Sequence, residues 1–296
     1  MDLSIIIVAW NNEKEIGRVL RSVFGCLQGL KAELFVIDNA SADGTRAAIG
    51  TVLDSHLYGN DNVAIKTIWN PDNKGFAAAV NQGLTQSSGE FVLLLNPDAE
   101  LVPGALRSIV EYLRRHREVG IAGGKLLNFD GSLQRSVRRF PTWKDQAVIL
   151  LKWHNFFPRL VARYFASDLD YEKEQEVDQV RGAFFFVSRE LIDKIGPLDD
   201  RGFFIWFEEV DYCRRAKNSG FKVMYLPFAL CRHEGGTSFA KQLSFKKQRW
   251  LNRSMYNYFK KHGNARDQAV VALLAPLSLA LAYLAEKANI RPRRYV

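Results

Sequence analysis

Hydrophobic and polar positions alternate in two kinds of block over the first 120 residues. Short apolar runs, typical of strands buried on both faces, are followed by stretches in which apolar residues recur every three or four positions, as in helices. Strands are predicted at 4–9, 33–38, 63–69 and 91–95, and helices at 14–27, after 41–45, at 76–84 and at 103–116. This alternation predicts an α/β fold with a Rossmann-like, doubly wound, mostly parallel sheet and right-handed crossovers.

The pattern becomes less regular after residue 120. Further strands are predicted at 120–126, 180–187 and 222–226, and a helix at 189–195. Residues 143–165 are rich in aromatic side chains without a regular period, and we expect residues 128–177 to form loops and irregular helix that face a substrate. The chain divides into a body at 1–240, with halves at about 1–120 and 121–240, and C-terminal helices at 241–296.

The C-terminal part contains two helical patterns. Residues 243–262 are basic and aromatic, and residues 269–285 are almost wholly apolar, interrupted by Pro276 and followed by Lys287, Arg291, Arg293 and Arg294. A bilayer span needs about 20 apolar residues, so this run is marginal as a span. A helix on an anionic membrane surface is predicted, since the flanking cations would meet lipid head groups. The alternative is a helix packed on the body or on a second subunit, as in a homodimer.

Composition limits the partners and the compartment. The formal charge of +9 suits a polyanionic partner: nucleotide phosphates, nucleic acid or an anionic lipid surface. The three cysteines are widely spaced and form no Cys-x-x-Cys, which indicates neither a disulfide framework nor a zinc site and favours a reducing compartment. Asp2 and the short first apolar run favour a first strand over a signal peptide.

Carboxylates follow two of the predicted strands. Asp38 ends the second strand, and Asp98 follows the fourth after Pro97. Open α/β sheets bind ligands at the carboxyl ends of their strands, so both side chains are candidates for a site. Asn96 and Asp98 offer the oxygen ligands that Mg²⁺ prefers. Asp98 as the N-cap of the helix at 103–116 is the open alternative.

Two more candidates come later in the chain. Glu208 and Glu209 follow a dense apolar run, where burial would raise a carboxyl pKa and suit a general base. His233, with Asp98, is a candidate ligand for a divalent metal that neutralises a diphosphate leaving group. The chain lacks both a Gly-x-Gly-x-x-Gly after its first strand and a Gly-Lys-Ser/Thr loop, which argues against dinucleotide oxidoreductases and P-loop kinases.

An ordered series of motifs resembles the family 2 glycosyltransferases of the GT-A fold, and most of all their rhamnosyltransferase-like branch. The motifs are SIIIVAWN at 4–11, VIDNASADGT at 36–45, NKGFAAAVN at 73–81, LLLNPD at 93–98, FFIWFEEVDYCR at 203–214, and His233. The resemblance covers residues 3 to 260, roughly. It implies a GT-A catalytic domain at 1–240, nucleotide-binding in its first half and acceptor-binding in its second.

The resemblance also implies roles for single residues. It places Mg²⁺ or Mn²⁺ on Asp98 and His233, with Asn96 replacing the first acid of the family's Asp-x-Asp motif, which leaves fewer negative charges for the cation. It makes Glu209 the catalytic base, with Glu208 as the second choice. The nucleotide and donor sugar would contact Ala9, Asn11, Glu13, Asp38, Asn73, Lys74, Gly75, Asn96, Arg181 and Gly182.

The expected function is metal-dependent, inverting transfer of a sugar, such as the deoxysugar rhamnose, from a nucleotide-diphosphate donor such as dTDP-sugar. The acceptor would be a lipid-linked or cell-surface glycan of cell wall polysaccharide biosynthesis. The enzyme would be peripheral on the cytoplasmic face of the cell membrane, without a nucleic-acid partner. One alternative is a sugar nucleotidyltransferase, which expects a Gly-rich basic loop where this chain has residues 11–14. The other is a nucleic-acid-binding protein that uses Arg135, Arg138 and Arg139.

Overall fold

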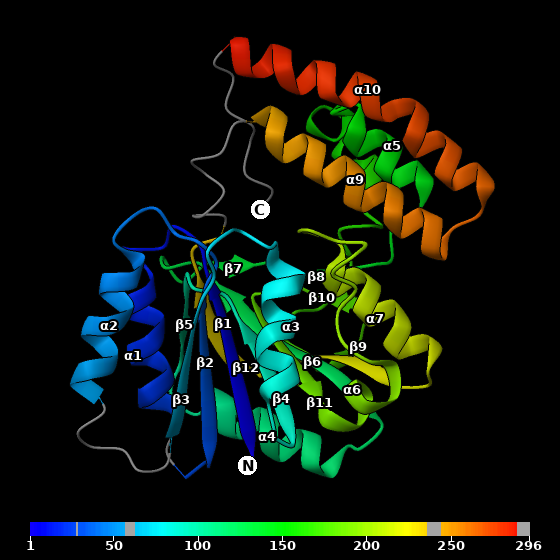
Figure 1. Cartoon of the computed structure of the whole chain (residues 1–296). Coiled ribbons are helices and arrows are strands. Elements are labelled where there is room, and N and C mark those ends of the chain that lie inside the picture. Colours follow the sequence, from blue (N-terminus) through cyan, green and yellow to red (C-terminus); the bar gives the residue numbers. More distant parts are fainter. Residues whose placement is uncertain (28, 57–62, 236–243, 289–296) are drawn as a thin grey trace.

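The computed structural model describes residues 1–27, 29–56, 63–235 and 244–288. A central sheet has helices on both faces, and three helices lie together beyond the end of the sheet at which β1 (Leu3–Ala9) finishes (Figure 1). The strand order is β3-β2-β1-β4-β11-β6-β12-β5. This is an α/β architecture whose sheet is mostly parallel.

The first half follows the predicted alternation. Strands β1, β2 (Ala32–Asp38), β3 (Val63–Trp69) and β4 (Phe91–Leu95) pair in parallel. The helices between and after them are α1 (Ile16–Cys26), α2 (Thr45–His56), α3 (Phe76–Gln86) and α4 (Ala105–Arg115). Helices α1, α2 and α4 cover one face of the sheet, and α3 lies on the other. Because β1, β2 and β4 are buried along their whole length, their near-continuous apolar runs predicted them well.

The second half differs from the expected parallel pattern at its centre. The single strand predicted at 180–187 is wrong: β10 (Gln179–Val180) and β11 (Phe184–Ser188) are separate strands, divided at residues 181–183. Strand β11 lies between β4 and β6 (Val119–Leu127) and is antiparallel to both, whereas β10 pairs with β8 (Val137–Arg138) in a small second sheet. The break places Arg181 and Gly182 next to the end of β4, where Asn96 donates its backbone N–H to the Ala183 carbonyl.

Strand β12 (Lys222–His233) is longer than predicted. It continues past Pro227 through a register irregularity between Leu226 and Leu230, a place that tolerates a proline. It pairs in parallel with β6 and antiparallel with β5 (Ala99–Leu101) and β9 (Gln175–Glu176). His233 is thus the last residue of a strand, in register with Ala99. Asp98 precedes β5, and Gly104 is the N-cap of α4, so the alternative that Asp98 caps this helix is excluded.

Residues 128–177 contain little regular structure, as predicted, but include one well-capped helix. Helix α5 (Trp143–Leu150) begins with a capping box between Thr142 and Asp145. The remainder forms β7 (Leu133–Gln134), β8, β9 and the short 3-10 helices η1 (Trp153–Asn155) and η2 (Pro158–Val161). Helices α6 (Arg189–Ile195) and α7 (Glu208–Asn218) cover the same sheet face as α3. The start of α7 at Glu208 was not predicted.

The C-terminal residues form α9 (Ser244–His262) and α10 (Ala265–Lys287), which pack on each other and on α5 (Figure 1). Met255, Tyr258 and Val271 share an apolar cluster with Phe207 and Val210, beside the start of α7. Helix α10 is longer than predicted because Asn264 and Asp267 form a capping box that starts it at Ala265. The first residue of the predicted helix at 243–262, Leu243, and the cations Arg291, Arg293 and Arg294 lie outside the described residues.

Candidate active site

A cavity of about 670 Å³ lies at the carboxyl ends of β1 and β4 and extends to α5 and α9. Many of the residues predicted from the sequence line it, although they come from distant parts of the chain. They are Asn73, Gly75, Asn96, Asp98, Arg181, Gly182, Glu208, Glu209 and His233. The strand ends and the loops after them therefore bring one carboxylate, one imidazole and a glutamate pair to a common cavity.

Asp98, Asn96 and His233 form one end of this site. His233 Nε2 lies 3.2 Å from Asp98 Oδ1 and 3.2 Å from Asn96 Nδ2. The Asp98 and His233 side chains are almost fully buried, 4% and 3% exposed. Turn residues place Asp98 and Asn96 here, since β4 ends at Leu95 and Pro97 cannot continue strand pairing.

Gln134, which the sequence analysis did not single out, fixes the orientation of His233. The His233 Nδ1 atom lies 2.7 Å from Gln134 Oε1, and the Gln134 amide nitrogen donates to the His233 carbonyl (3.2 Å) and to Asn128 Oδ1 (2.9 Å). Because the glutamine oxygen can only accept, His233 Nδ1 carries a proton and donates it to Gln134, and the Nε2 atom faces Asp98 and Asn96. Strand β7 has two residues and no hydrophobic pattern, so no sequence signal identified Gln134.

These residues fit a divalent cation, but only with help from a ligand. A carboxylate oxygen, an amide oxygen and an imidazole nitrogen oriented by a neighbouring amide are donors that suit Mn²⁺ or Mg²⁺. Within the described ranges, no three His, Cys, Asp or Glu side chains gather as a metal site. The protein thus offers an incomplete set of ligands, which the oxygens of a diphosphate can complete.

Glu208 and Glu209 are the first two residues of α7. Trp206 and Phe207, directly before them, both adopt left-handed backbone angles, with φ of 61° and 68°. Bulky residues rarely have positive φ, and such strain is concentrated at functional sites. The turn brings both glutamates to the cavity with the backbone N–H groups of the helix start beside them.

The two glutamates differ in their electrostatic surroundings. Burial raises the pKa of Glu208 well above its ordinary value, and the Glu209 carboxyl raises it further. Burial also raises the pKa of Glu209, but nearby backbone N–H groups and the Arg181 guanidinium oppose this effect. A shared proton is therefore held more firmly by Glu208, and Glu209 is the carboxylate that ionises first.

The loop at 73–75 forms another part of the cavity wall. Asn39, a residue the sequence analysis missed, donates to Asn73 Oδ1 (3.0 Å) and accepts from the Lys74 backbone N–H (3.2 Å). Gly75 has φ of 87°, and a Cβ there would lie 2.6 Å from the Phe204 carbonyl oxygen. Only glycine fits at this contact, which joins the loop to the segment that carries the glutamates. Asn39 was adjacent to the predicted Asp38, so its position at a strand end was the available signal.

Five of the predicted donor-site residues do not line the cavity: Ala9, Asn11, Glu13, Asp38 and Lys74. Asp38 is fully buried and its Oδ2 lies 2.6 Å from Arg46 Nε. Asn11 and Glu13 accept backbone N–H groups of Ala42 and Gly44, so they hold the loop after β2. These side chains shape the loops around the strand ends rather than the cavity wall itself.

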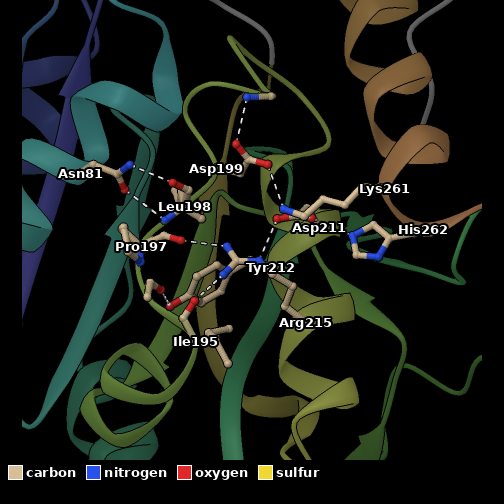
Figure 2. A network of polar contacts seen from close by, with 12 residues as sticks. Asn81, Ile195, Pro197, Leu198, Asp199, Asp211, Tyr212, Arg215, Lys261 and His262 are labelled. Atoms are coloured by element: carbon tan, nitrogen blue, oxygen red, sulfur yellow. Dashed lines mark hydrogen bonds and ion pairs between the residues drawn. The ribbon is translucent and has the colours of Figure 1, made fainter.

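A buried polar network fixes α7 against α9. Figure 2 shows Asp211 of α7 facing Arg215, Lys261 and His262, at distances of 2.9, 2.9 and 2.7 Å. Asp199 accepts from Lys261 (2.8 Å), and the Tyr212 hydroxyl donates to the Gly196 carbonyl (3.0 Å). The network holds the first turn of α7, and with it Glu208 and Glu209, at a defined place beside the C-terminal helices.

Comparison with known proteins identifies the family of this chain. Residues 4–196 match the family model described as glycosyl transferase family 2. The chain belongs to glycosyl transferase family 2. Family membership supports glycosyltransferase activity, which was the leading expectation from the sequence.

Relatives within the family are distant. The N-acetylglucosaminyl-diphospho-decaprenol L-rhamnosyltransferase of Mycobacterium tuberculosis is 25% identical over 245 residues, which cover 78% of this chain and 75% of that protein. An uncharacterised protein of Sinorhizobium fredii, y4gI, is 25% identical over 84% of this chain, but the chain spans only 27% of its length.

A solved structure shares the architecture of this chain. A mannosyltransferase of Pyrobaculum calidifontis, PcManGT, solved with GDP-Man and Mn²⁺, has a TM-score of 0.61 and 18% identity, and the alignment covers 97% of this chain and 74% of that one. The fold is GT-A, as the motifs predicted.

Proposed function

We propose that this family 2 member is an inverting, metal-dependent glycosyltransferase that uses a nucleotide-diphosphate sugar. The observation that supports this most directly is that Asp98 and His233 line the same cavity as Glu208 and Glu209. Displacement at an anomeric carbon needs a group that stabilises the departing diphosphate and a base for the attacking hydroxyl, and residues suited to each role line this one cavity.

In the proposed reaction, Glu209 takes the proton of an acceptor hydroxyl. The oxygen bonds to the anomeric carbon on the face opposite the diphosphate, and the carbon–oxygen bond to the diphosphate breaks, its electron pair leaving with the nucleoside diphosphate. Glu209 is preferred over Glu208 because Arg181 and the helix N–H groups favour its ionised form.

Asp98 and His233 would hold Mg²⁺ or Mn²⁺, with Asn96 beside them. A bound cation supplies neutralisation of the charge that develops on the leaving diphosphate. Asn73 and Gly75, held by Asn39, would close over the nucleotide, and Gly182 would lie near the donor sugar. Ala9, Asn11, Glu13, Asp38 and Lys74 would shape the base pocket from the loops behind the cavity wall.

The donor and acceptor are proposed from the relatives. The Mycobacterium tuberculosis relative is named for transfer of L-rhamnose to a diphospho-decaprenol-linked sugar, which supports a deoxysugar such as rhamnose, a dTDP donor and a lipid-linked acceptor here. The apolar part of the cavity wall, formed by Ile149, Leu251 and Met255, suits an acceptor that carries an apolar chain.

We further propose that the enzyme works at the cytoplasmic face of a membrane. Helix α10 is long and apolar enough to cross a bilayer, with a mean hydropathy of 1.9 and 17% of its most apolar window buried. Leu273 and Leu284 on it are 77% and 61% exposed. Exposed cations of α9, including Lys246, Arg249 and Arg253, suit anionic head groups beside it.

A thermal-shift panel tests the proposed function. We expect stabilisation by one class of nucleoside diphosphate, increased by Mg²⁺ or Mn²⁺, because a ligand at about 100 times its Kd adds about 2.7 kcal/mol to the free energy of unfolding. Asp98→Asn should lose the metal-dependent part of the shift. The absence of any nucleotide-dependent shift in the wild-type chain would exclude a nucleotide-sugar donor.

A further inference from the structure

Two arginines of the cavity wall, Arg138 and Arg181, donate their hydrogen bonds to uncharged acceptors. The Arg138 guanidinium of β8 donates to the backbone carbonyls of Arg135 (3.2 Å) and Val137 (2.8 Å) and lies 4.7 Å from the centre of the Phe165 ring. Arg181 donates to Gln134 Oε1 (3.0 Å). In the described part of the chain, no carboxylate forms an ion pair with Arg138 or Arg181.

Two further polar groups of the same wall are unsatisfied. The Ser136 hydroxyl and the Gln146 amide nitrogen are buried without a hydrogen-bond partner among the residues that the structure describes. Ser136 is 4% exposed and Gln146 is 1% exposed, and both line the cavity. Unsatisfied buried donors destabilise a fold, so their presence in a cavity indicates a ligand that accepts hydrogen bonds.

Without a bound ligand, the position of these two arginines is also electrostatically unfavourable. Burial and the nearby Arg181 guanidinium lower the pKa of Arg138 to about 10. Two neighbouring, partly buried guanidinium groups repel each other and lose hydration, an effect that the Glu209 and Asp98 carboxylates oppose at Arg181. Guanidinium groups bind phosphate by paired hydrogen bonds, so a phosphate would relieve both effects.

This donor-rich region lies beside the proposed base. Arg181 is the cation that lowers the pKa of Glu209, and Tyr164 lines the same cavity as Arg138 and Glu209. The acceptor hydroxyl must meet Glu209, so an anion bound here is on the acceptor side. Ile149 of α5 and Met255 of α9 continue the wall with apolar surface.

We propose that Arg138 and Arg181 form a binding site for a phosphate group of the acceptor. Ser136 and Gln146 complete the site, and the acceptor's apolar chain lies along the wall formed by α5 and α9. This inference rests on the proposed function and specifies its acceptor as a lipid phosphate or diphosphate ester rather than a neutral glycan.

The test measures binding of farnesyl diphosphate by titration calorimetry to protein saturated with dTDP and Mg²⁺. We expect the wild-type chain to bind it and Arg138→Gln to bind it about tenfold more weakly or worse, the effect of losing charge-assisted hydrogen bonds. Arg139→Gln is the matched control, because Arg139 pairs with Asp168 (2.6 Å) and should leave the affinity within about twofold. The affinity for dTDP should be the same in all three proteins.

Several results would overturn the inference. Equal binding by Arg138→Gln, or equal affinity of the wild type for farnesol and farnesyl diphosphate, excludes a phosphate site at Arg138. Competition between farnesyl diphosphate and dTDP, or a parallel loss of dTDP affinity in Arg138→Gln, assigns the arginine to the donor diphosphate instead. If the wild type does not bind dTDP at all, the proposed function itself is in question. Failure of the proposed function is thus distinguishable from failure of the phosphate site.

A melting curve separates a ligand-binding role from a structural one. Removing a cation that has no acidic partner should leave the melting temperature of Arg138→Gln unchanged or raised. If Arg138→Gln does not fold, Arg138→Lys takes its place, since lysine keeps the charge without the paired hydrogen bonds. Arg138→Lys should then bind farnesyl diphosphate more weakly than the wild type, and wild-type affinity would overturn the proposal.

Discussion

Glu209 is the residue on which the proposed reaction depends most directly. Glu209→Gln removes the base but keeps the size of the side chain, so we expect transfer to fall by about 10² to 10⁴ fold, the usual range for loss of a general base. Nucleotide-diphosphate affinity should be nearly unchanged. Steady-state transfer rates and calorimetric Kd values for both proteins measure the two quantities.

Glu208→Gln serves as the comparison for this variant. Glu208 holds its proton more firmly, so its amide should change transfer less than Glu209→Gln does. Retained transfer in Glu209→Gln together with loss in Glu208→Gln would exchange the two roles.

The pH dependence of transfer follows from the same carboxyl group. The pKa of Glu209 is raised above its ordinary value of 4.5, mainly by burial, and the base must be ionised to act. Transfer should therefore decline as the pH falls through this raised pKa, at a pH at which an exposed glutamate is still ionised. A pH–rate profile of kcat measures this, and a flat profile down to pH 4.5 would contradict it.

Gln134 is expected to act on the metal through His233. Gln134→Leu removes the acceptor that keeps the imidazole proton on Nδ1. The tautomer with a free lone pair on Nε2, which is the form that can bind the cation, is then no longer favoured. Loss of such a partner typically weakens metal binding by about 10 to 100 fold. Mn²⁺ titration of the nucleotide-bound protein, followed by electron paramagnetic resonance, measures the Kd.

Gln134→Glu is the informative companion variant, because a carboxylate still accepts from Nδ1. It should retain most of the Mn²⁺ affinity. Equal Mn²⁺ binding by the wild type and Gln134→Leu would show that the imidazole orientation does not depend on this residue.

The sequence predicted individual residues only where a local pattern marked them. Asp98 and the glutamate pair were candidates because each follows a dense apolar run, and the structure places them in one cavity. Gln134 and Asn39 act through partners 99 and 34 residues away, His233 and Asn73. Such contacts depend on tertiary packing, which a local pattern does not contain.

At the scale of elements, the polar network that joins α7 to α9 through Asp211 is the most testable feature. Asp211 has no exposed surface, and Asp211→Asn would leave Arg215, Lys261 and His262 near one another without their carboxylate. We expect a loss of about 3 kcal/mol in the free energy of unfolding, the usual cost of breaking a buried ion pair. Urea denaturation monitored by circular dichroism measures it.

Asp199→Asn is the matched control for Asp211→Asn. It removes a carboxylate that also pairs with Lys261 but is 29% exposed, so the loss should stay below about 1 kcal/mol. Equal losses in the two variants would mean that Asp211 has no special role.

Acid titration gives an independent check on Asp211. Burial alone would raise its pKa, but His262, Arg215 and Lys261 together lower it below the ordinary 3.8. The ion pairs should thus stabilise the fold fully above pH 3.8, and their contribution should be lost as the pH falls through the lowered pKa.

Elements were predictable where burial gives the sequence a clear hydrophobic pattern, either a continuous apolar run or helical spacing. Strands β1, β2 and β4 are buried throughout, and α1 shows the apolar spacing Ile16, Val19, Leu20 and Val23. The direction of β11 was not predictable, because an apolar run reads the same in a parallel and an antiparallel strand. The start of α7 was missed because left-handed angles at Trp206 and Phe207 are set by packing, not by residues that favour them.

At the scale of the whole molecule, the exposed leucines of α10 allow a test of the proposed membrane contact. The double variant Leu273→Ser/Leu284→Ser removes two exposed leucines, so we expect binding to phosphatidylglycerol vesicles to weaken by at least about tenfold. Vesicle co-sedimentation measures it. Phe228→Ser is the control, because Phe228 is 46% exposed but lies beside Tyr112 of α4, and it should bind as the wild type does.

Vesicle binding that is equal in the wild type and the double variant would exclude α10 as the membrane contact. The folded state should be equally stable in both, since neither leucine is buried. A concentration-dependent dimer that the double variant abolishes would instead identify the face as a contact between two copies.

The apolar cluster between the C-terminal helices and the segment before α7 has a practical consequence for preparing the enzyme. Membrane-associating proteins are often shortened to obtain a well-behaved sample, and a chain cut at residue 240 would look like a complete catalytic unit. It would, however, lose Met255, Tyr258 and Val271 from their packing on Phe207 and Val210. We expect such a shortened chain to aggregate or to be inactive, so a mild detergent with the chain that includes α9 and α10 is the better choice.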